Sequence, residues 1–281
     1  VIRIDPAAQG SRAPVSAYHQ PTSGIFYFSG VLGAGHIDEY LLPLAPFFCY
    51  AAAKMGTADL DYVQLARRID LYTGGIGFSA NARTRFDGRR DCLPFVAFTG
   101  KCLSRNQDKM VDILNELATR LRFEDHERLH QLVLEYRAGL EAAVIHNGHR
   151  LAMSLAARNF TPASHLQEIW GGIHQLHTIK QVEKETAGGN LSDLAANLKA
   201  VGTALFSREN TRLALVAEKA SLDHAAAFVQ ALTDALPTGG RDGTLHYGRL
   251  DLGIYNLPSH IPANFPVATG MAFAAKYRGE D

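Results

Sequence analysis

The chain has 281 residues, of which 47% are hydrophobic and 20% charged, a composition typical of a globular protein with a sizeable buried core. Lysine plus arginine and aspartate plus glutamate each number 28, so no overall electric field favours nucleic acid or an anionic membrane. We therefore expect neither a nucleic-acid partner nor a membrane partner.

The N-terminal part is predicted to contain a strand followed by two helices. Residues 23–32 are rich in aromatic and β-branched residues between glycines, which indicates a buried strand. Residues 37–55 are apolar over too long a stretch for one strand, so we predict a buried helix with a kink near Pro43 and Pro46. A second helix is expected at residues 61–72, where it ends before a pair of glycines.

A β-hairpin is predicted next. Residues 76–85 alternate between apolar and polar side chains, which indicates a strand with one face in water. Asp87-Gly88 predicts a turn, and residues 93–103 form the returning strand. Because both faces of this second strand are apolar, we expect it to lie nearer the centre of an antiparallel sheet.

A helical block of about residues 104–205 follows, in which apolar residues recur at intervals of three and four positions. We expect four helices, interrupted near residues 146–149, 158–162 and 187–190. After the block, the pattern indicates a short strand, a helix and a glycine-rich linker. The whole pattern predicts an α+β fold, with an antiparallel sheet and helices packed on one side.

The pentapeptide His126-Glu127-Arg128-Leu129-His130 spells H-E-x-x-H, the motif that gives zinc peptidases two ligands and a general base. At about 100° per residue, His126 and His130 flank the apolar stripe of their helix, and Glu127 points toward solvent. No third ligand is evident from the sequence. We therefore interpret the histidines as boundary residues that bind adventitious metal at most, and we expect no catalytic residue and no metal ligand in this chain.

A second near match begins at His36, which Glu39 follows three residues later. The inverted motif H-x-x-E-H requires a histidine at the next position, where this chain has Tyr40. A lone histidine cannot present two ligands on one helical face, so we interpret His36 as a helix-entry residue. Gly-rich nucleotide-binding motifs and G-x-S-x-G are absent from the sequence, which disfavours nucleotide chemistry and a serine nucleophile.

The cysteines and the chain start bear on localisation. Cys49, Cys92 and Cys102 are too few for a disulfide framework and lack Cys-x-x-Cys spacing. We therefore expect a reducing compartment, the cytoplasm. The sequence begins at Val1 without a methionine or a targeting segment, and no apolar run reaches the roughly 18 residues of a membrane span. We interpret the sequence as a piece of a longer protein.

Residues 41–76, LLPLAPFFCYAAAKMGTADLDYVQLARRIDLYTGGI, resemble the non-catalytic third domain of presequence-protease-like zinc metallopeptidases of the pitrilysin/insulinase (inverzincin) family. The resemblance continues more loosely through the hairpin and the long helices. It resumes at residues 257–270, which look like the start of the family's fourth domain. It implies that residues 1–240 are an inactive pitrilysin/insulinase-like peptidase domain and that residues 241–281 are a linker and the opening strand of the next homologous domain.

In this family, four homologous domains enclose a substrate chamber, and the zinc motif lies in the first domain. Alignment at Gly56-Thr57 places the ligand and base positions of the motif at Phe47, Tyr50 and Ala51, which cannot hold zinc. Glu135 is the nearest candidate for the family's glutamate ligand. The resemblance therefore implies no cofactor in this chain and zinc in the parent enzyme.

The implied function is that of a non-catalytic domain of a zinc-dependent metallopeptidase that degrades unfolded peptides, where it forms part of the closed substrate chamber. Its implied partners are the other domains of the same peptidase and an unfolded peptide substrate. In catalytic domains, the first hairpin strand resembles a docking edge for extended peptides. The matching residues here are Ile76, Gly77, Phe78, Ser79 and Ala80.

Two alternatives remain open at the level of sequence. The first is a stand-alone structural subunit of the same fold, since a fold does not fix a function. The second is an autonomous metallohydrolase that uses the pentapeptide residues His126, Glu127 and His130.

Overall fold

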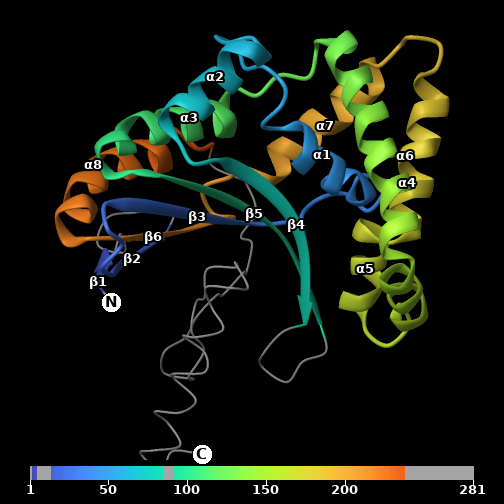
Figure 1. Cartoon of the computed structure of the whole chain (residues 1–281), viewed down its shortest axis with the longest axis horizontal. Coiled ribbons are helices and arrows are strands. Elements are labelled where there is room, and N and C mark those ends of the chain that lie inside the picture. Colours follow the sequence, from blue (N-terminus) through green and yellow to red (C-terminus); the bar gives the residue numbers. More distant parts are fainter. Residues whose placement is uncertain (1, 5–13, 85–90, 238–281) are drawn as a thin grey trace, which may run out of the picture. The chain divides into compact units, whose positions relative to one another are not determined.

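The structure is a computed structural model that describes residues 2–4, 14–84 and 91–237. These residues form a six-stranded sheet with helices on one side (Figure 1). The predicted α+β class, with helices on one side of a sheet, is therefore confirmed. The predicted turn at Asp87-Gly88 and the predicted linker and strand at residues 241–281 lie outside the described residues.

The sheet has the strand order β1-β2-β6-β3-β5-β4. Its strands are β1 (Ile2–Ile4), β2 (Val15–His19), β3 (Ile25–Gly33), β4 (Ile76–Thr84), β5 (Cys92–Leu103) and β6 (Thr211–Ala217). Neighbouring strands are antiparallel, except that β2 pairs with β6 in parallel. The predicted hairpin is present as β4 and β5, whereas β1 and β2, which precede the strand that we predicted first, were missed.

Eight α-helices are present in the described residues. They are α1 (Ala45–Ala51), α2 (Tyr62–Tyr72), α3 (Gln107–Thr119), α4 (His126–Ala157), α5 (Pro162–Gly171), α6 (Ile173–Thr186), α7 (Ser192–Leu205) and α8 (Lys219–Ala235). All of them are too short or too polar to span a bilayer. The prediction of four helices in the block at 104–205 was wrong, because α3 to α7 make five.

Two details explain that miscount. The predicted break at residues 146–149 is only a kink, since α4 continues past Asn147, whose φ of −125° and ψ of 25° are not helical. Two breaks were not predicted: one separates α3 from α4 between Thr119 and His126, and the other separates α5 from α6 at Gly172. The break near Thr161-Pro162 is confirmed: Thr161 caps α5 by accepting a hydrogen bond from the Ser164 amide, and the proline occupies the first turn.

The helix predicted at residues 37–55 is much shorter than expected. Residues 37–41 form turns, a 3₁₀ helix spans Leu42–Leu44, and α1 begins only at Ala45. A proline lies in the first turn of each helix, the position where the missing N–H costs nothing. The prolines therefore start new helical segments. The prediction of one long helix with a kink was wrong.

The core lies between the sheet and its helices. Phe26, Phe28 and Leu32 on β3 and Val96 and Phe98 on β5 are all 2% exposed or less. Their alternation places every second residue of each strand on the helix-covered face. The ring of Phe98 also stacks on Phe78 of β4 at 4.4 Å. These rings fix the edge of the sheet against the helices.

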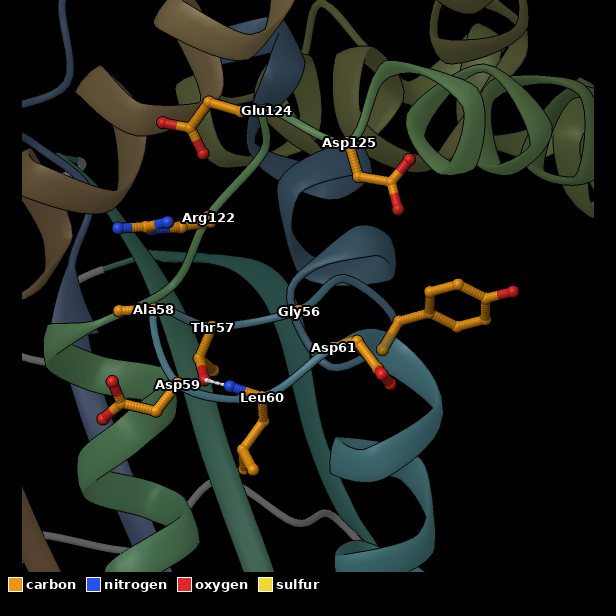
Figure 2. Close-up of a pocket in the computed structure, with 10 residues that line it drawn as sticks. Gly56, Thr57, Ala58, Asp59, Leu60, Asp61, Arg122, Glu124 and Asp125 are labelled. Atoms are coloured by element: carbon orange, nitrogen blue, oxygen red, sulfur yellow. Dashed lines mark hydrogen bonds between the residues drawn. The ribbon is translucent and has the colours of Figure 1, made fainter.

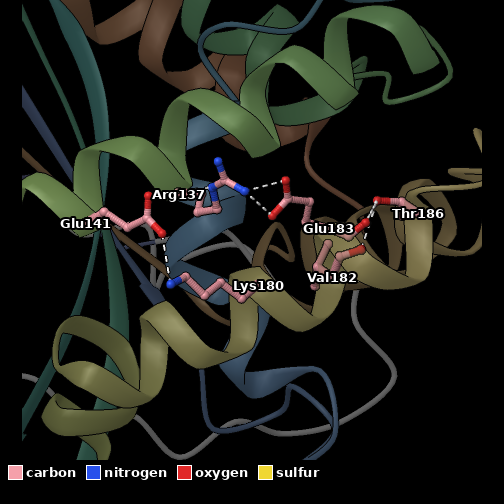
Figure 3. Close-up of polar contacts among 6 residues, drawn as sticks. All are labelled: Arg137, Glu141, Lys180, Val182, Glu183 and Thr186. Carbon is pink, nitrogen blue, oxygen red and sulfur yellow. Dashed lines mark hydrogen bonds and ion pairs between the residues drawn. The ribbon is translucent and has the colours of Figure 1, made fainter.

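The helical block extends beyond β4, where α4, α5 and α6 form a separate group (Figure 1). Polar contacts join α4 to α6, as Figure 3 shows. The Arg137 guanidinium contacts both carboxylate oxygens of Glu183, at 2.5 and 2.6 Å, and Lys180 lies 2.9 Å from Glu141. These pairs fix the register of the two helices on their solvent side.

Candidate functional site

Helix α1 carries the three positions where the family resemblance places a zinc motif. Phe47 and Ala51 are fully buried, and Tyr50 is half-buried. A phenyl ring and a methyl group offer no lone pair to a metal, and a neutral phenol is a poor base. The residues present at these positions do not fit zinc.

Glu135 of α4 lies against this part of α1. The hydroxyl of Tyr50 donates a hydrogen bond to Glu135 Oε2 at 3.2 Å. Arg128, about two helical turns earlier on α4, approaches the other carboxylate oxygen at 3.7 Å. The carboxylate that resembles a third ligand is thus held by a phenol and a guanidinium.

Aromatic packing fills the rest of this position. The ring of Tyr136 lies 5.5 Å from that of Phe47 and 4.9 Å from that of Tyr50. Burial raises the pKa of the Tyr136 hydroxyl and of the Cys49 thiol far above their ordinary values, because the charged forms would lose their hydration. Both groups remain protonated at neutral pH, so neither supplies a nucleophile or an anionic ligand.

Two cations cover the outer side of the cluster. The ammonium of Lys54 lies 3.4 Å from the centre of the Tyr50 ring, and Arg128 lies 4.6 Å from the centre of the Tyr62 ring. Arg128 also donates to the carbonyl oxygen of Lys54 at 3.2 Å. These contacts join α1, α2 and α4 through charge and aromatic faces. The degenerate motif therefore serves as packing.

The pentapeptide lies at the start of α4. Asp125 caps the helix by accepting a hydrogen bond from the Arg128 amide. His126 and His130 are half-buried, and Glu127 is exposed, which confirms the predicted orientation of the would-be base. Among residues 2–4, 14–84 and 91–237, no group of three or more histidine, cysteine, aspartate or glutamate residues is placed to hold a metal ion. Adventitious metal binding by the histidine pair stays a prediction.

His36 does not lie on a helix. It is exposed in a turn that follows β3, so the prediction that it enters a helix was wrong. The reason is the late start of α1, which begins nine residues further along the chain. His36 therefore has no helical partner four residues away, and the near match to the inverted motif has no structural counterpart.

A pocket of about 380 Å³ lies beside this cluster (Figure 2). Its lining runs from Gly56 to Tyr62 and includes Arg122, Glu124 and Asp125. Four of its residues are acidic, and all four side chains are engaged locally: Glu124 accepts a hydrogen bond from the Phe123 amide at 3.1 Å. Asp61 and Asp125 cap α2 and α4, and Asp59 pairs with Arg120. The acidity of the pocket therefore arises from two helix starts that meet there.

The strand predicted to contact substrate, β4, is the terminal strand of the sheet. Ala82 on β4 faces Pro94 on β5, and proline has no N–H, so this pair cannot exchange hydrogen bonds. Because bonded and non-bonded pairs alternate in an antiparallel ladder, the backbone groups of Ile76, Phe78 and Ala80 also point away from β5.

One contact supports this assignment of register. The side-chain amide of Gln167 on α5 donates to the carbonyl oxygen of Ala82 at 2.8 Å, so that oxygen does point outward. Helix α5 thereby covers the far end of the β4 edge. The segment from Ile76 to Ala80 is half-buried, with Ser79 exposed. On this side β4 has no neighbouring strand among the described residues.

The degenerate motif and the sheet edge adjoin each other. Phe48 on α1 packs on Phe78 of β4, with ring centres 6.3 Å apart. The sequence pattern identified both segments, but the tertiary structure brings them together. The partners of Glu135, namely Tyr50 and Arg128, were not predicted from the sequence, and no spacing pattern could have indicated them.

Three comparisons place this arrangement among known proteins. Residues 3–182 match the family described as peptidase M16-C associated. The chain is 33% identical over 227 residues to the mitochondrial presequence protease of Danio rerio. This match covers 81% of this chain and 22% of that protein. It is also 28% identical over 258 residues to presequence protease 1, chloroplastic/mitochondrial, of Arabidopsis thaliana. That match covers 91% of this chain and 24% of the relative.

Among solved structures, the fold is similar to that of the peptidase M16 inactive domain from Pseudomonas fluorescens. The TM-score is 0.57 at 19% identity, with 85% of this chain and 52% of that chain covered. This similarity concerns the fold alone. The chain spans about a quarter or less of the length of the curated relatives named above.

Proposed function

The chain belongs to the peptidase M16-C associated family and is a non-catalytic peptidase domain, and from this premise we propose that it forms part of the wall of a closed substrate chamber. In this proposal, zinc and a catalytic glutamate elsewhere in a longer polypeptide hydrolyse unfolded peptides. The partners of this chain are the other domains of that polypeptide and the peptide itself.

The filled motif on α1 is the observation that carries this proposal. Phe47 and Ala51 are buried at the ligand positions, and Tyr50 holds Glu135 by a hydrogen bond instead of acting on water. A domain that kept a catalytic role would need at least three protein ligands and an open coordination position. The cluster instead supports a structural and substrate-contacting role.

The β4 edge supports a contact with peptide. An extended peptide can pair with the outward backbone groups of Ile76, Phe78 and Ala80, and such pairing is largely independent of the peptide's side chains. That property suits a protein that binds unfolded chains of varied sequence. The two ends of the β4 edge differ in the backbone groups left for a peptide, because the carbonyl oxygen of Ala82 already accepts a hydrogen bond from Gln167.

The compartment follows the same reasoning. The three cysteines are free, which supports a reducing compartment, and we propose the cytoplasm or an organelle interior. The second choice rests on the printed names of the relatives from Danio rerio and Arabidopsis thaliana, which are mitochondrial or chloroplastic.

Metal analysis and a peptidase assay test the proposal directly. The protein made from the whole reading frame should retain zinc after mild chelator dialysis and cleave casein or a quenched peptide. The 281-residue chain alone should do neither. If the chain alone bound stoichiometric zinc, and lost it together with activity on His130→Ala, the pentapeptide would be a true metal site. A reading frame that ends near Asp281 would instead favour a stand-alone structural subunit.

A further inference from the structure

The second half of α4 exposes large apolar side chains. Its first half is anchored in the core, where Leu129, Leu132 and Val133 are fully buried. Beyond Glu141 the helix leaves this core, and Ile145 is 82% exposed and Met153 69% exposed. Phe160, just after the helix, is 79% exposed. Apolar surface of this kind on a helix commonly marks an interaction site.

The exposed residues follow the spacing of a packed helix. After the kink at Asn147, His149, Ala152, Met153 and Ala156 lie at positions i, i+3, i+4 and i+7, and all four are exposed. This spacing places them along one stripe, which we call, together with the exposed Ile145 just before the kink, the α4 seam. Its two alanines would let another helix approach closely, because short side chains keep the helix axes near each other.

The other side of this half-helix faces the protein. Leu151, Ser154 and Ala157 are half-buried, and the Ser154 hydroxyl lies near enough to the buried carboxylate of Glu168 on α5 to help lower its pKa. Helix α4 is therefore fixed on α5, with the seam turned away from it. A rigid helix with a fixed outward stripe is a better docking surface than a fraying terminus, since little conformational entropy is lost on binding.

The charged residues of this segment are of one sign. From Ala142 to Gln167 the sequence has no aspartate or glutamate, and it has two arginines and three histidines. Arg150 is exposed beside the seam and Arg158 is half-buried. A partner with an apolar stripe and acidic flanks would match this surface. A second copy of the chain would instead bring two basic surfaces together.

We propose that the α4 seam docks an amphipathic helix with acidic flanks from another domain of the same polypeptide. The inference rests on the proposed function, since relatives such as the Danio rerio protein are several times longer than the matched segment, which is 22% of that protein. It adds the location of the contact and the chemistry of the partner. The peptide substrate, by contrast, fits the backbone edge of β4.

Cysteine labelling tests the proposal with a matched control. Met153 and Leu71 are both 69% exposed, on α4 and α2 respectively, so Met153→Cys and Leu71→Cys start from equal exposure. Both are placed in a Cys92→Ser background, because Cys92 is the cysteine that is not buried. Each is made in the 281-residue chain and in the protein from the whole reading frame, and the rate of maleimide labelling is measured.

We expect Met153→Cys to react at least about tenfold more slowly in the longer protein, and Leu71→Cys to differ by less than about twofold. Ile145→Asp should lower the melting temperature of the longer protein and leave that of the 281-residue chain unchanged, since Ile145 makes little contact in the chain itself. Equal labelling of Met153→Cys in both proteins would overturn the proposal.

Three further outcomes would also overturn it. Protection of Met153→Cys that appears in the chain alone and grows with protein concentration would identify a second copy as the occupant. Protection only with anionic phosphatidylserine vesicles would identify a membrane surface, and protection only with added casein peptides would identify substrate. The failure of the proposed function is distinguishable, because it requires that the whole reading frame encode no zinc motif. The docking proposal fails if the zinc motif is present and Met153→Cys still reacts with maleimide at the same rate in the longer protein.

Discussion

The hydroxyl of Tyr50 on α1 donates a hydrogen bond to the carboxylate of Glu135 on α4, across 85 positions of sequence. The two residues occupy the places where related catalytic domains are expected to have a base and a metal ligand. The contact shows that these two positions, implied by the family resemblance, lie side by side. The carboxylate of Glu135 accepts a hydrogen bond from a phenol and is not part of a group that could hold a metal among the described residues.

This correspondence predicts that two histidines create a metal site. Phe47→His together with Ala51→His creates an i,i+4 pair on α1, and Glu135 is near enough to serve as a third ligand. We expect the double variant to bind one zinc ion per chain, measured by equilibrium dialysis and elemental analysis. Adding Glu135→Ala should weaken zinc binding by at least about tenfold.

Circular dichroism must first show that the double variant is folded, because a histidine at the buried Ala51 position overpacks the core by an amount that costs about 1–3 kcal/mol. A folded double variant with no more zinc than the wild-type chain would contradict the correspondence. Retention of zinc after Glu135→Ala would show that the ion binds elsewhere.

The register of β4 predicts opposite effects for two adjacent prolines. In Ala80→Pro the lost N–H points outward, so the fold should be retained and peptide binding weakened. In Ser79→Pro the lost N–H belongs to the ladder with β5, so the free energy of unfolding should fall by about 3 kcal/mol or more. Urea denaturation and fluorescence anisotropy with a labelled unfolded peptide measure the two effects. Equal destabilisation by both prolines would refute the assigned register.

Glu168 should make the stability depend on pH. This side chain is 1% exposed and accepts hydrogen bonds from the Ile173 amide at 2.9 Å and from His174 at 3.2 Å. Burial opposes its ionisation, yet bonds from Ser154, His174 and Ile173 outweigh burial and lower its pKa. Because the folded pKa lies below the unfolded value of about 4.3, the carboxylate stabilises the fold above that pH, and its contribution is lost as the pH falls through the folded pKa.

Glu168→Gln should therefore flatten the acid limb of the stability curve, as measured by thermal melts between neutral pH and acid. The matched control is Glu135→Gln, which removes an exposed carboxylate from the same helical group and should leave the acid limb largely in place. An unchanged acid limb in Glu168→Gln would show that other carboxylates control acid unfolding.

The same carboxylate explains why Gly172 is a glycine. A β-carbon at this position would overlap the carboxylate of Glu168, which substitutes for a capping side chain at the start of α6. We expect Gly172→Ala to destabilise the protein by about 1–3 kcal/mol in urea denaturation. Gly171→Ala is the control, because a β-carbon there meets no atom within 4 Å. Equal effects of the two alanines would contradict this explanation.

The ion pairs between α4 and α6 predict a shift in one pKa (Figure 3). The hydrogen bond from Lys180, followed by attraction to Lys180 and Arg137, lowers the pKa of Glu141. Lys180→Gln should therefore raise this pKa toward the ordinary glutamate value, as measured by carbon NMR. Arg137→Gln should raise it less, since Arg137 lies 3.8 Å away and Lys180 2.9 Å. The reverse order would contradict the geometry.

The sequence by itself determined most of the local structure. The alternation in residues 76–84 indicated β4, and Thr161-Pro162 indicated the start of α5, because both signals depend on neighbouring residues. The helical phase of the pentapeptide also indicated that Glu127 faces solvent. The family resemblance came from residues 41–76, where spacing and residue type are read directly from the chain.

Only the tertiary structure decided the rest, because the deciding contacts join residues far apart in sequence. Strand β2 is a short segment that gains its place by pairing with β6, about 200 residues later. The break at Gly172 depends on the buried Glu168 carboxylate, and the meaning of Glu135 depends on Tyr50. Such contacts depend on how packed elements meet in space, and a periodic pattern along one element carries no information about that meeting.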